Sequence, residues 1–123
     1  MRSLEHIQGT RRGDRFLIVL AELIGERVRK SDIACRYGGE EFLLVLPGAT
    51  LTDAAKRADE LRLECANVRI PHKGKDLQIT ISMGVATYPL HGKKPEEIVI
   101  KADKALYLSK QNGRNRVTIW EES

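Results

Sequence analysis

The sequence is poor in the residues that metal and redox sites need. Cysteine occurs twice, as Cys35 and Cys65, with no CxxC spacing and no interleaved histidines. This pattern favours structural thiols in a reducing compartment over a zinc site or a disulfide. His6, His72 and His91 are scattered along the chain, so we assign none of them chemistry.

Long apolar runs are also absent. The longest, Phe16–Ala21, is interrupted at Glu22, far short of the roughly 20 residues that a membrane span needs. The first six residues have no apolar signal-peptide core. We therefore expect a soluble, cytoplasmic protein with no membrane partner. Aromatic residues make up only 5% of the chain and no Lys/Arg stripe is present, so nucleic acid is not an expected partner.

What is present fits an ordinary globular domain. The chain has 123 residues, of which 41% are apolar and 31% charged. A single domain of this size buries about two-thirds of the surface that its unfolded form exposes. The formal net charge of +4 favours anionic partners, phosphates above all, although a solvated basic surface explains the charge equally well.

Hydrophobic periodicity predicts the order of the elements. Helical spacing indicates helices over residues 12–29, 52–67, with Thr52 as the cap, and from Pro95 to a left-handed end at Gly113. Strand patterns cover residues 33–37, 41–46, 77–87 and 116–120. The fold class that follows is α+β, an antiparallel or mixed sheet with helices packed on its faces.

One stretch carries most of the functional information, RYGGEEFLLVLPG at residues 36–48. Two glycines join two short strands, which is typical of a β-hairpin whose turn needs positive φ. The hairpin is preceded by RKSD and followed by ISMGVATYP and ADKALYLSKQNGRNRV. Together these motifs resemble the GGDEF domain of bacterial diguanylate cyclases, from about Gly9 to Trp120. The resemblance implies a fold like that of polymerase palms and adenylyl cyclases, and a homodimer that joins two GTP molecules into cyclic di-GMP.

The resemblance also implies an active half-site. Gly38 and Gly39 would let the backbone approach the nucleotide without a Cβ clash. Glu40 would bind a divalent cation or help activate the ribose hydroxyl, and Glu41 would support the loop. Mg²⁺ suits this role because it bridges carboxylates and phosphate oxygens, and we expect it only if the cyclase site works. A plain hairpin turn with solvated acids remains the alternative.

Three further residues match family positions of that half-site. Lys110 and Arg114 correspond to the residues that hold the terminal phosphates, and a spacing of four at a helix end lets two cations converge on one anion. Asp14 corresponds to the acid that accepts from the guanine edge. Each also has a structural explanation, since basic residues are favoured at a helix C-terminus and Asp at a helix cap.

A second site is implied by Arg29 and Asp32, which form the RxxD inhibitory motif ahead of the glycine pair. A guanidinium fork matches the O6 and N7 acceptors of guanine, and a carboxylate can accept from the opposite edge. The family site binds cyclic di-GMP and usually takes a second basic residue, for which Arg57 and Arg62 are candidates. The alternative is a helix-end ion pair contributing at most about 1 kcal/mol.

The chain departs from the family at its start. The family's first strand, with its metal-binding aspartate, would lie before Met1, so we expect residues 1–123 to be one truncated GGDEF domain. The guanine-binding asparagine position falls on Glu5, which has no amide N–H to offer. Because the missing strand is central, either the N-terminal residues rearrange, the gap closes, or a second copy covers it.

The leading hypothesis is therefore a truncated GGDEF domain that binds cyclic di-GMP through Arg29 and Asp32 without cyclase activity. The first alternative is an active cyclase, its missing segment removed by cloning or supplied by another chain, because Glu40, Glu41 and the basic pair are retained. The second is an interaction domain that binds no nucleotide.

Overall fold

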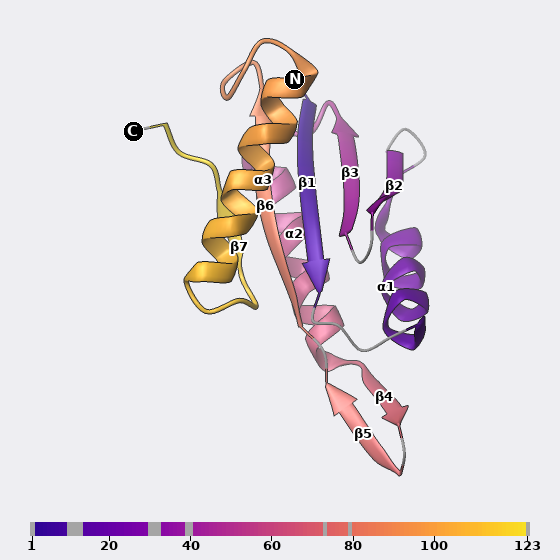
Figure 1. The fold of residues 1–123 in the computed structure, drawn as a ribbon. Helices are drawn as coiled ribbons and strands as arrows, with labels where there is room; N and C mark the ends of the chain where they lie inside the picture. Colours follow the sequence, from indigo (N-terminus) through magenta and orange to yellow (C-terminus); the bar gives the residue numbers. More distant parts are fainter. Residues whose placement is uncertain are drawn as a thin grey trace.

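The structure is a computed structural model (Figure 1). It describes residues 2–9, 14–29, 33–38, 41–72, 74–78 and 80–122. Within these ranges the elements are β1 (Arg2–Gly9), α1 (Asp14–Arg27), β2 (Ile33–Gly38), β3 (Glu41–Pro47), α2 (Leu51–Asn67), β4 (Arg69–His72), β5 (Lys75–Gln78), β6 (Ile81–Tyr88), α3 (Pro95–Gln111) and β7 (Val117–Ile119).

The described strands form a five-stranded sheet in the order β2-β3-β1-β6-β7 and a separate two-stranded sheet of β4 and β5. Neighbours in the main sheet pair antiparallel, except that β7 runs parallel to β6. Helices lie on both faces of this sheet (Figure 1). The predicted α+β class is confirmed.

The centre of the sheet is occupied by the N-terminal residues. β1 pairs with β3 over Arg2–Gln8 and with β6 over Arg2–Gly9. The expected gap at the centre of the sheet is therefore wrong for this chain, because residues 2–9 fill it. The physical reason is that β3 and β6 would otherwise expose two rows of unpaired N–H and C=O groups, which one extended segment satisfies together.

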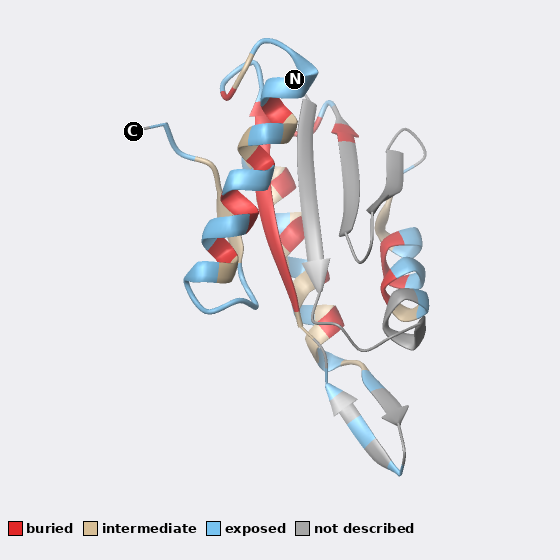
Figure 2. Ribbon diagram, in the orientation of Figure 1, coloured by how far each residue is buried: buried red, intermediate tan, exposed pale blue. Residues whose placement is uncertain are grey.

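The core lies on both faces of β6, which is buried from Ile81 to Thr87 (Figure 2). Ile81, Met83 and Val85 pack with residues of α1 and α2. Ala86, on the opposite face, packs with residues of α3. Because side chains alternate between the faces of a strand, α1 and α2 cover one face and α3 the other.

The predicted buried stripes of the helices are largely confirmed. In α2 and α3 the stripe residues are at most 5% exposed: Ala54, Ala58, Leu61, Cys65, Ile98, Ala102, Ala105 and Leu106. In α1, Leu20, Leu23 and Ile24 are buried and Val28 packs partly buried against them, while the side chain of Phe16 is not among those described. The buried faces of these helices could be predicted from the sequence because apolar residues recur every three to four positions.

Two predicted boundaries were wrong. The residues predicted as one strand over 77–87 form the end of β5 and most of β6, and only β6 joins the main sheet. Alternation specifies an extended chain but not its partner, and here the partner changes between Gln78 and Ile81. The cap of α2 is Thr50, whose Oγ1 accepts the N–H of Asp53 at 3.1 Å, not Thr52.

Two buried groups of the core are titratable. Cys65 is a free thiol with no exposed surface, and burial raises its pKa to about 11. His91 is 4% exposed, and its Nδ1 accepts the Thr87 N–H at 3.0 Å. Desolvation lowers the pKa of His91. Cys35 lies in β2, and its side chain is outside the described residues.

Candidate functional site

The glycine hairpin forms as the sequence predicts. β2 and β3 pair antiparallel from Ile33 opposite Val45 to Gly38 opposite Glu41, with a register shift just before Gly38. Gly39 and Glu40, between the strands, lie outside the described residues, as does the side chain of Glu41. The structure therefore confirms the antiparallel pairing of the two strands, while the turn conformation and the roles of the two acids stay predictions.

The two ends of α1 carry different candidate residues. Asp14 is the first residue of the helix, and Arg29 lies just beyond its last residue. At 1.5 Å of rise per residue the two are about 22 Å apart. Asp14 and Arg29 therefore lie far apart at opposite ends of α1, and their roles in two separate sites stay predictions.

Arg29 lies beside α2. Its side chain is 62% exposed, and its Nη2 is 3.7 Å from Oδ2 of Asp53. One turn further along α2, Arg57 donates from Nη2 to the carbonyl of Arg27 at 3.2 Å. Arg29, Asp53 and Arg57 thus form one cluster between the end of α1 and the start of α2, which we call the α1–α2 cluster. Asp32 lies outside the described residues.

The end of α1 is fixed by a further pair of acids. Arg27 donates from Nε to Glu64 at 2.7 Å and from Nη1 to Glu60 at 3.4 Å, and its Nη2 also contacts Glu64. These contacts raise the pKa of Arg27. The contacts of Arg27 with Glu60 and Glu64, and the position of Asp53 beside Arg29, were not predicted from the sequence. Acids four residues apart on one helix, as Glu60 and Glu64 are, lie on the same side and can share a basic partner.

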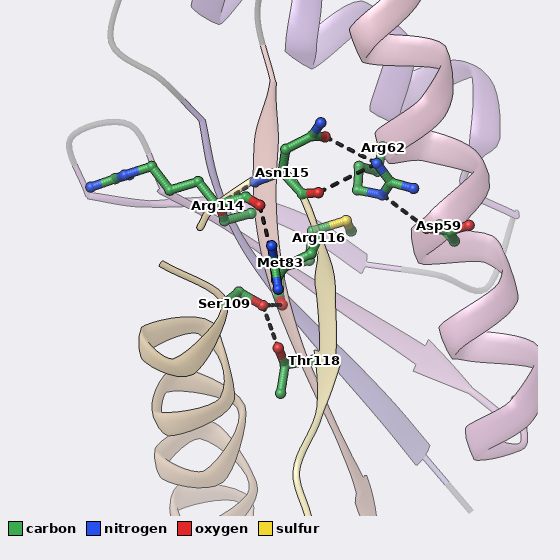
Figure 3. Close-up of polar contacts among 9 residues, drawn as sticks. Asp59, Arg62, Met83, Ser109, Arg114, Asn115, Arg116 and Thr118 are labelled. Atoms are coloured by element: carbon green, nitrogen blue, oxygen red, sulfur yellow. Dashed lines mark hydrogen bonds and ion pairs between the residues drawn. The ribbon is translucent and has the colours of Figure 1, made fainter. Parts of the chain in front are cut away.

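Arg62 lies on another side of α2. Five residues separate it from Arg57, which corresponds to a rotation of about 140° around the helix. Its side chain is 19% exposed and donates from Nε to Asp59 at 2.8 Å. Its Nη1 donates to the Asn115 side chain at 3.0 Å and carbonyl at 3.4 Å (Figure 3). Of the two basic candidates, only Arg57 is brought to Arg29.

The segment after α3 has an unusual backbone. Gly113, Arg114 and Asn115 have φ values of 118°, 62° and 47°. The Arg114 N–H donates to the Ser109 carbonyl at 2.9 Å. Its exposed side chain points away from the contact between Arg62 and Asn115 (Figure 3).

Lys110 belongs to the last turn of α3, which ends at Gln111. Arg114 therefore lies beyond the helix, so the i, i+4 geometry of a helix does not describe this pair, and their convergence on one anion stays a prediction. Any convergence of the two cations depends on the left-handed turn between them and not on helix geometry.

The described residues contain no group of three or more His, Cys, Asp or Glu that could hold a metal. Glu40, the predicted ligand, is outside them. In the same part of the chain, no helix combines the length and the apolarity that crossing a bilayer requires.

Sequence comparison connects these features to known proteins. A family profile described as "Diguanylate cyclase, GGDEF domain" matches residues 3–116. Diguanylate cyclase A of Treponema denticola is 40% identical over 118 residues, 96% of this chain and 32% of that protein. Response regulator PleD of Caulobacter vibrioides is 36% identical over 107 residues, 85% of this chain and 24% of that protein. The chain spans about a quarter to a third of the length of these relatives.

Solved structures agree over nearly the whole chain. The GGDEF domain of DgcB from Caulobacter crescentus, in complex with c-di-GMP, matches with a TM-score of 0.89 and 30% identity, covering 98% of this chain and 76% of that one. The active GGEEF domain of a diguanylate cyclase from Vibrio cholerae matches with a TM-score of 0.90 and 27% identity, covering 99% and 84%.

Proposed function

The chain belongs to the GGDEF domain family of diguanylate cyclases, and from this premise we propose that it binds cyclic di-GMP in bacterial signalling, at Arg29 and Asp32. The observation that carries the proposal is the α1–α2 cluster, where an exposed guanidinium lies at the end of α1 with Arg57 beside it. The likeness to a DgcB domain in complex with c-di-GMP supports the choice of ligand.

The charges around this cluster suit a ligand with two phosphodiester anions. Arg27 is paired with Glu60 and Glu64, so its charge is already balanced inside the protein. Arg29 lies 3.7 Å from Asp53, and 62% of its side chain is exposed. Its fork can reach the O6 and N7 edge of a guanine, while Arg57 would add positive potential next to the phosphates.

We further propose that this chain alone does not make cyclic di-GMP. Counting back from Asp14, the position of the family's guanine-binding asparagine would fall on Glu5, which lies in β1 opposite Leu44 and Val85. A carboxylate offers no N–H to the acceptor edge of the base, so half of the base recognition is lost. No catalytic step is assigned to Mg²⁺, because Glu40, the predicted ligand, lies outside the described residues.

A second candidate function is an active cyclase that works as a homodimer with GTP and Mg²⁺. Its support is the retention of Glu40, Glu41, Lys110 and Arg114, together with the likeness to the active GGEEF domain from Vibrio cholerae. In this function Lys110 and Arg114 bind the terminal phosphates of GTP.

Titration calorimetry with cyclic di-GMP tests the first proposal. Arg29→Ala should weaken binding about 10- to 100-fold, because a bidentate contact to guanine is worth about 1–3 kcal/mol. Arg69→Ala removes the same charge from the exposed start of β4 and should leave the affinity unchanged. Equal heats for Arg29→Ala and the unmodified chain would discard this site.

Incubation with GTP and Mg²⁺, followed by chromatography, tests the second candidate. Steady formation of cyclic di-GMP that is abolished by Glu40→Ala establishes the cyclase. No product together with tight cyclic di-GMP binding supports the binding domain. If no product forms and cyclic di-GMP does not bind, the result supports the remaining alternative, an interaction domain that binds no nucleotide.

A further inference from the structure

The segment that carries Arg114 has a conformation that its own residues disfavour. Gly113, Arg114 and Asn115 follow one another with positive φ. Glycine adopts this region readily and asparagine tolerates it, but an arginine does so only when its surroundings impose it. Contacts from the neighbouring elements therefore help to hold this conformation.

Those contacts come from three elements. The Arg114 N–H donates to the Ser109 carbonyl in the last turn of α3, and the Asn115 N–H donates to Oγ of Ser82 in β6 at 3.2 Å. From α2, Arg62 reaches both acceptors of Asn115, the main-chain carbonyl and the side-chain Oδ1 (Figure 3). The guanidinium thereby spans two partners, with Nε on Asp59 and Nη1 on Asn115, which the single terminal nitrogen of a lysine is poorly placed to reproduce.

Arg62 is itself held in place. Ser82, on the strand behind the turn, is 2% exposed, and the side chain of Arg62 is 19% exposed with its Nε bound to Asp59 at 2.8 Å. Its charge is matched within α2, and its Nη1 is engaged by Asn115. This arrangement suits a structural tether and not a group that binds a ligand.

Arg114 is in the opposite situation. Its hydrogen bonds to the described residues run through its main chain, where the N–H donates to Ser109 and the carbonyl accepts from Arg116 Nε at 3.1 Å. Its side chain is exposed and directed outward (Figure 3). Lys110, in the last turn of α3, adds a second cation near this end of the helix.

We propose that Arg62 is a positioning residue that holds residues 113–115 in the left-handed conformation and so presents the Arg114 guanidinium to the polyphosphate of a nucleotide. The inference rests on the second candidate function for the assignment of phosphate to Arg114. It gives Arg62 a role at the nucleotide turn and removes it from the cyclic di-GMP site.

The test compares GTP with GMP, because only GTP has the terminal phosphates. Isothermal titration of both ligands is run on the unmodified chain, Arg62→Lys, Arg114→Ala and the double variant, with Arg69→Lys as a matched control in the β4–β5 hairpin. Arg62→Lys should weaken GTP roughly ten-fold, the loss expected when hydrogen bonds from a charged group are removed, and leave GMP and cyclic di-GMP unchanged. The double variant should bind GTP no more weakly than Arg114→Ala alone.

Asn115→Ala removes the tether from the other side and should reproduce the GTP loss of Arg62→Lys, with thermal melts establishing that both variants fold. Additive losses in the double variant, or equal losses for GTP and GMP, overturn the positioning role while leaving the phosphate site intact. A loss of cyclic di-GMP affinity in Arg62→Lys returns this residue to the other site. If the unmodified chain binds GTP no more tightly than GMP, the phosphate assignment of Arg114 fails, and the inference fails with it.

Discussion

Replacing Gly84 with alanine should destabilise the protein more than any ordinary small substitution in a strand. A Cβ at this position would lie 2.2 Å from the Ala102 carbonyl oxygen, 2.3 Å from the Leu106 nitrogen and 2.9 Å from the Ala105 carbonyl carbon. All three atoms are backbone atoms of α3. No side-chain rotation can relieve the contact, so α3 must move away from β6 by about 1 Å before the distances become ordinary.

The cost can be worked from what that movement disturbs. Overpacking of a dense core costs about 1–3 kcal/mol. The movement also strains the bond from Ser109 Oγ to the Met83 carbonyl, 2.8 Å long across the same interface, which adds about 1 kcal/mol. We expect a loss of about 3 kcal/mol in the free energy of unfolding and a fall in Tm of about 10 °C.

Urea titration followed by circular dichroism measures this loss, and Gly25→Ala is the matched control. Gly25 lies within α1 with nothing within 4 Å of a built Cβ, so the same substitution should there stabilise the protein by about 0.5–1 kcal/mol. The two variants should move the urea midpoint in opposite directions. A Gly84→Ala midpoint close to that of the unmodified chain would refute the packing that we describe between α3 and β6.

Three further outcomes are expected. Cys65 is buried and its pKa is raised to about 11. In a Cys35→Ser variant, this thiol should therefore not react with a disulfide reagent at neutral pH until urea unfolds the chain. Rapid reaction of the native protein would contradict its burial. Burial lowers the pKa of His91 from 6.5, so the unfolded state takes up the proton first; stability is present above pH 6.5 and should fall as the pH drops below it. Urea midpoints at about pH 7.5 and about pH 5.5 should therefore differ less in His91→Gln, and an unchanged difference contradicts this assignment. Asp53→Asn removes the carboxylate 3.7 Å from Arg29. If the proposed site is right, cyclic di-GMP should bind about two- to five-fold more tightly to this variant. Weaker binding would mean that Asp53 helps to hold the ligand.

Local signals were enough for the glycine hairpin and for much of the helical structure. The predicted hairpin is confirmed because two apolar segments separated by glycines leave few other pairings. α3 begins at Pro95 as predicted, since proline suits the first helical turn. The GGDEF family could also be identified from the sequence, because each of its motifs is a short continuous run of residues that does not depend on how distant segments meet.

Other features depended on contacts between segments far apart in the sequence. Nothing in residues 2–9 alone predicts a central strand, and β1 exists because β3 and β6 present unpaired edges to it. The division of residues 77–87 between β5 and β6 likewise depends on the partner that each part finds.

The same division holds at the candidate sites. The sequence by itself determined which residues are proposed to carry the chemistry, Arg29 and Arg114 among them, because residue type and local spacing are properties of the chain. Only the tertiary structure decided their neighbours, bringing Arg57 and Asp53 to Arg29 and joining Arg62 to Asn115. The physical reason is that helical periodicity places a residue on one side of its own helix, while the element that packs against that side is chosen by the whole fold.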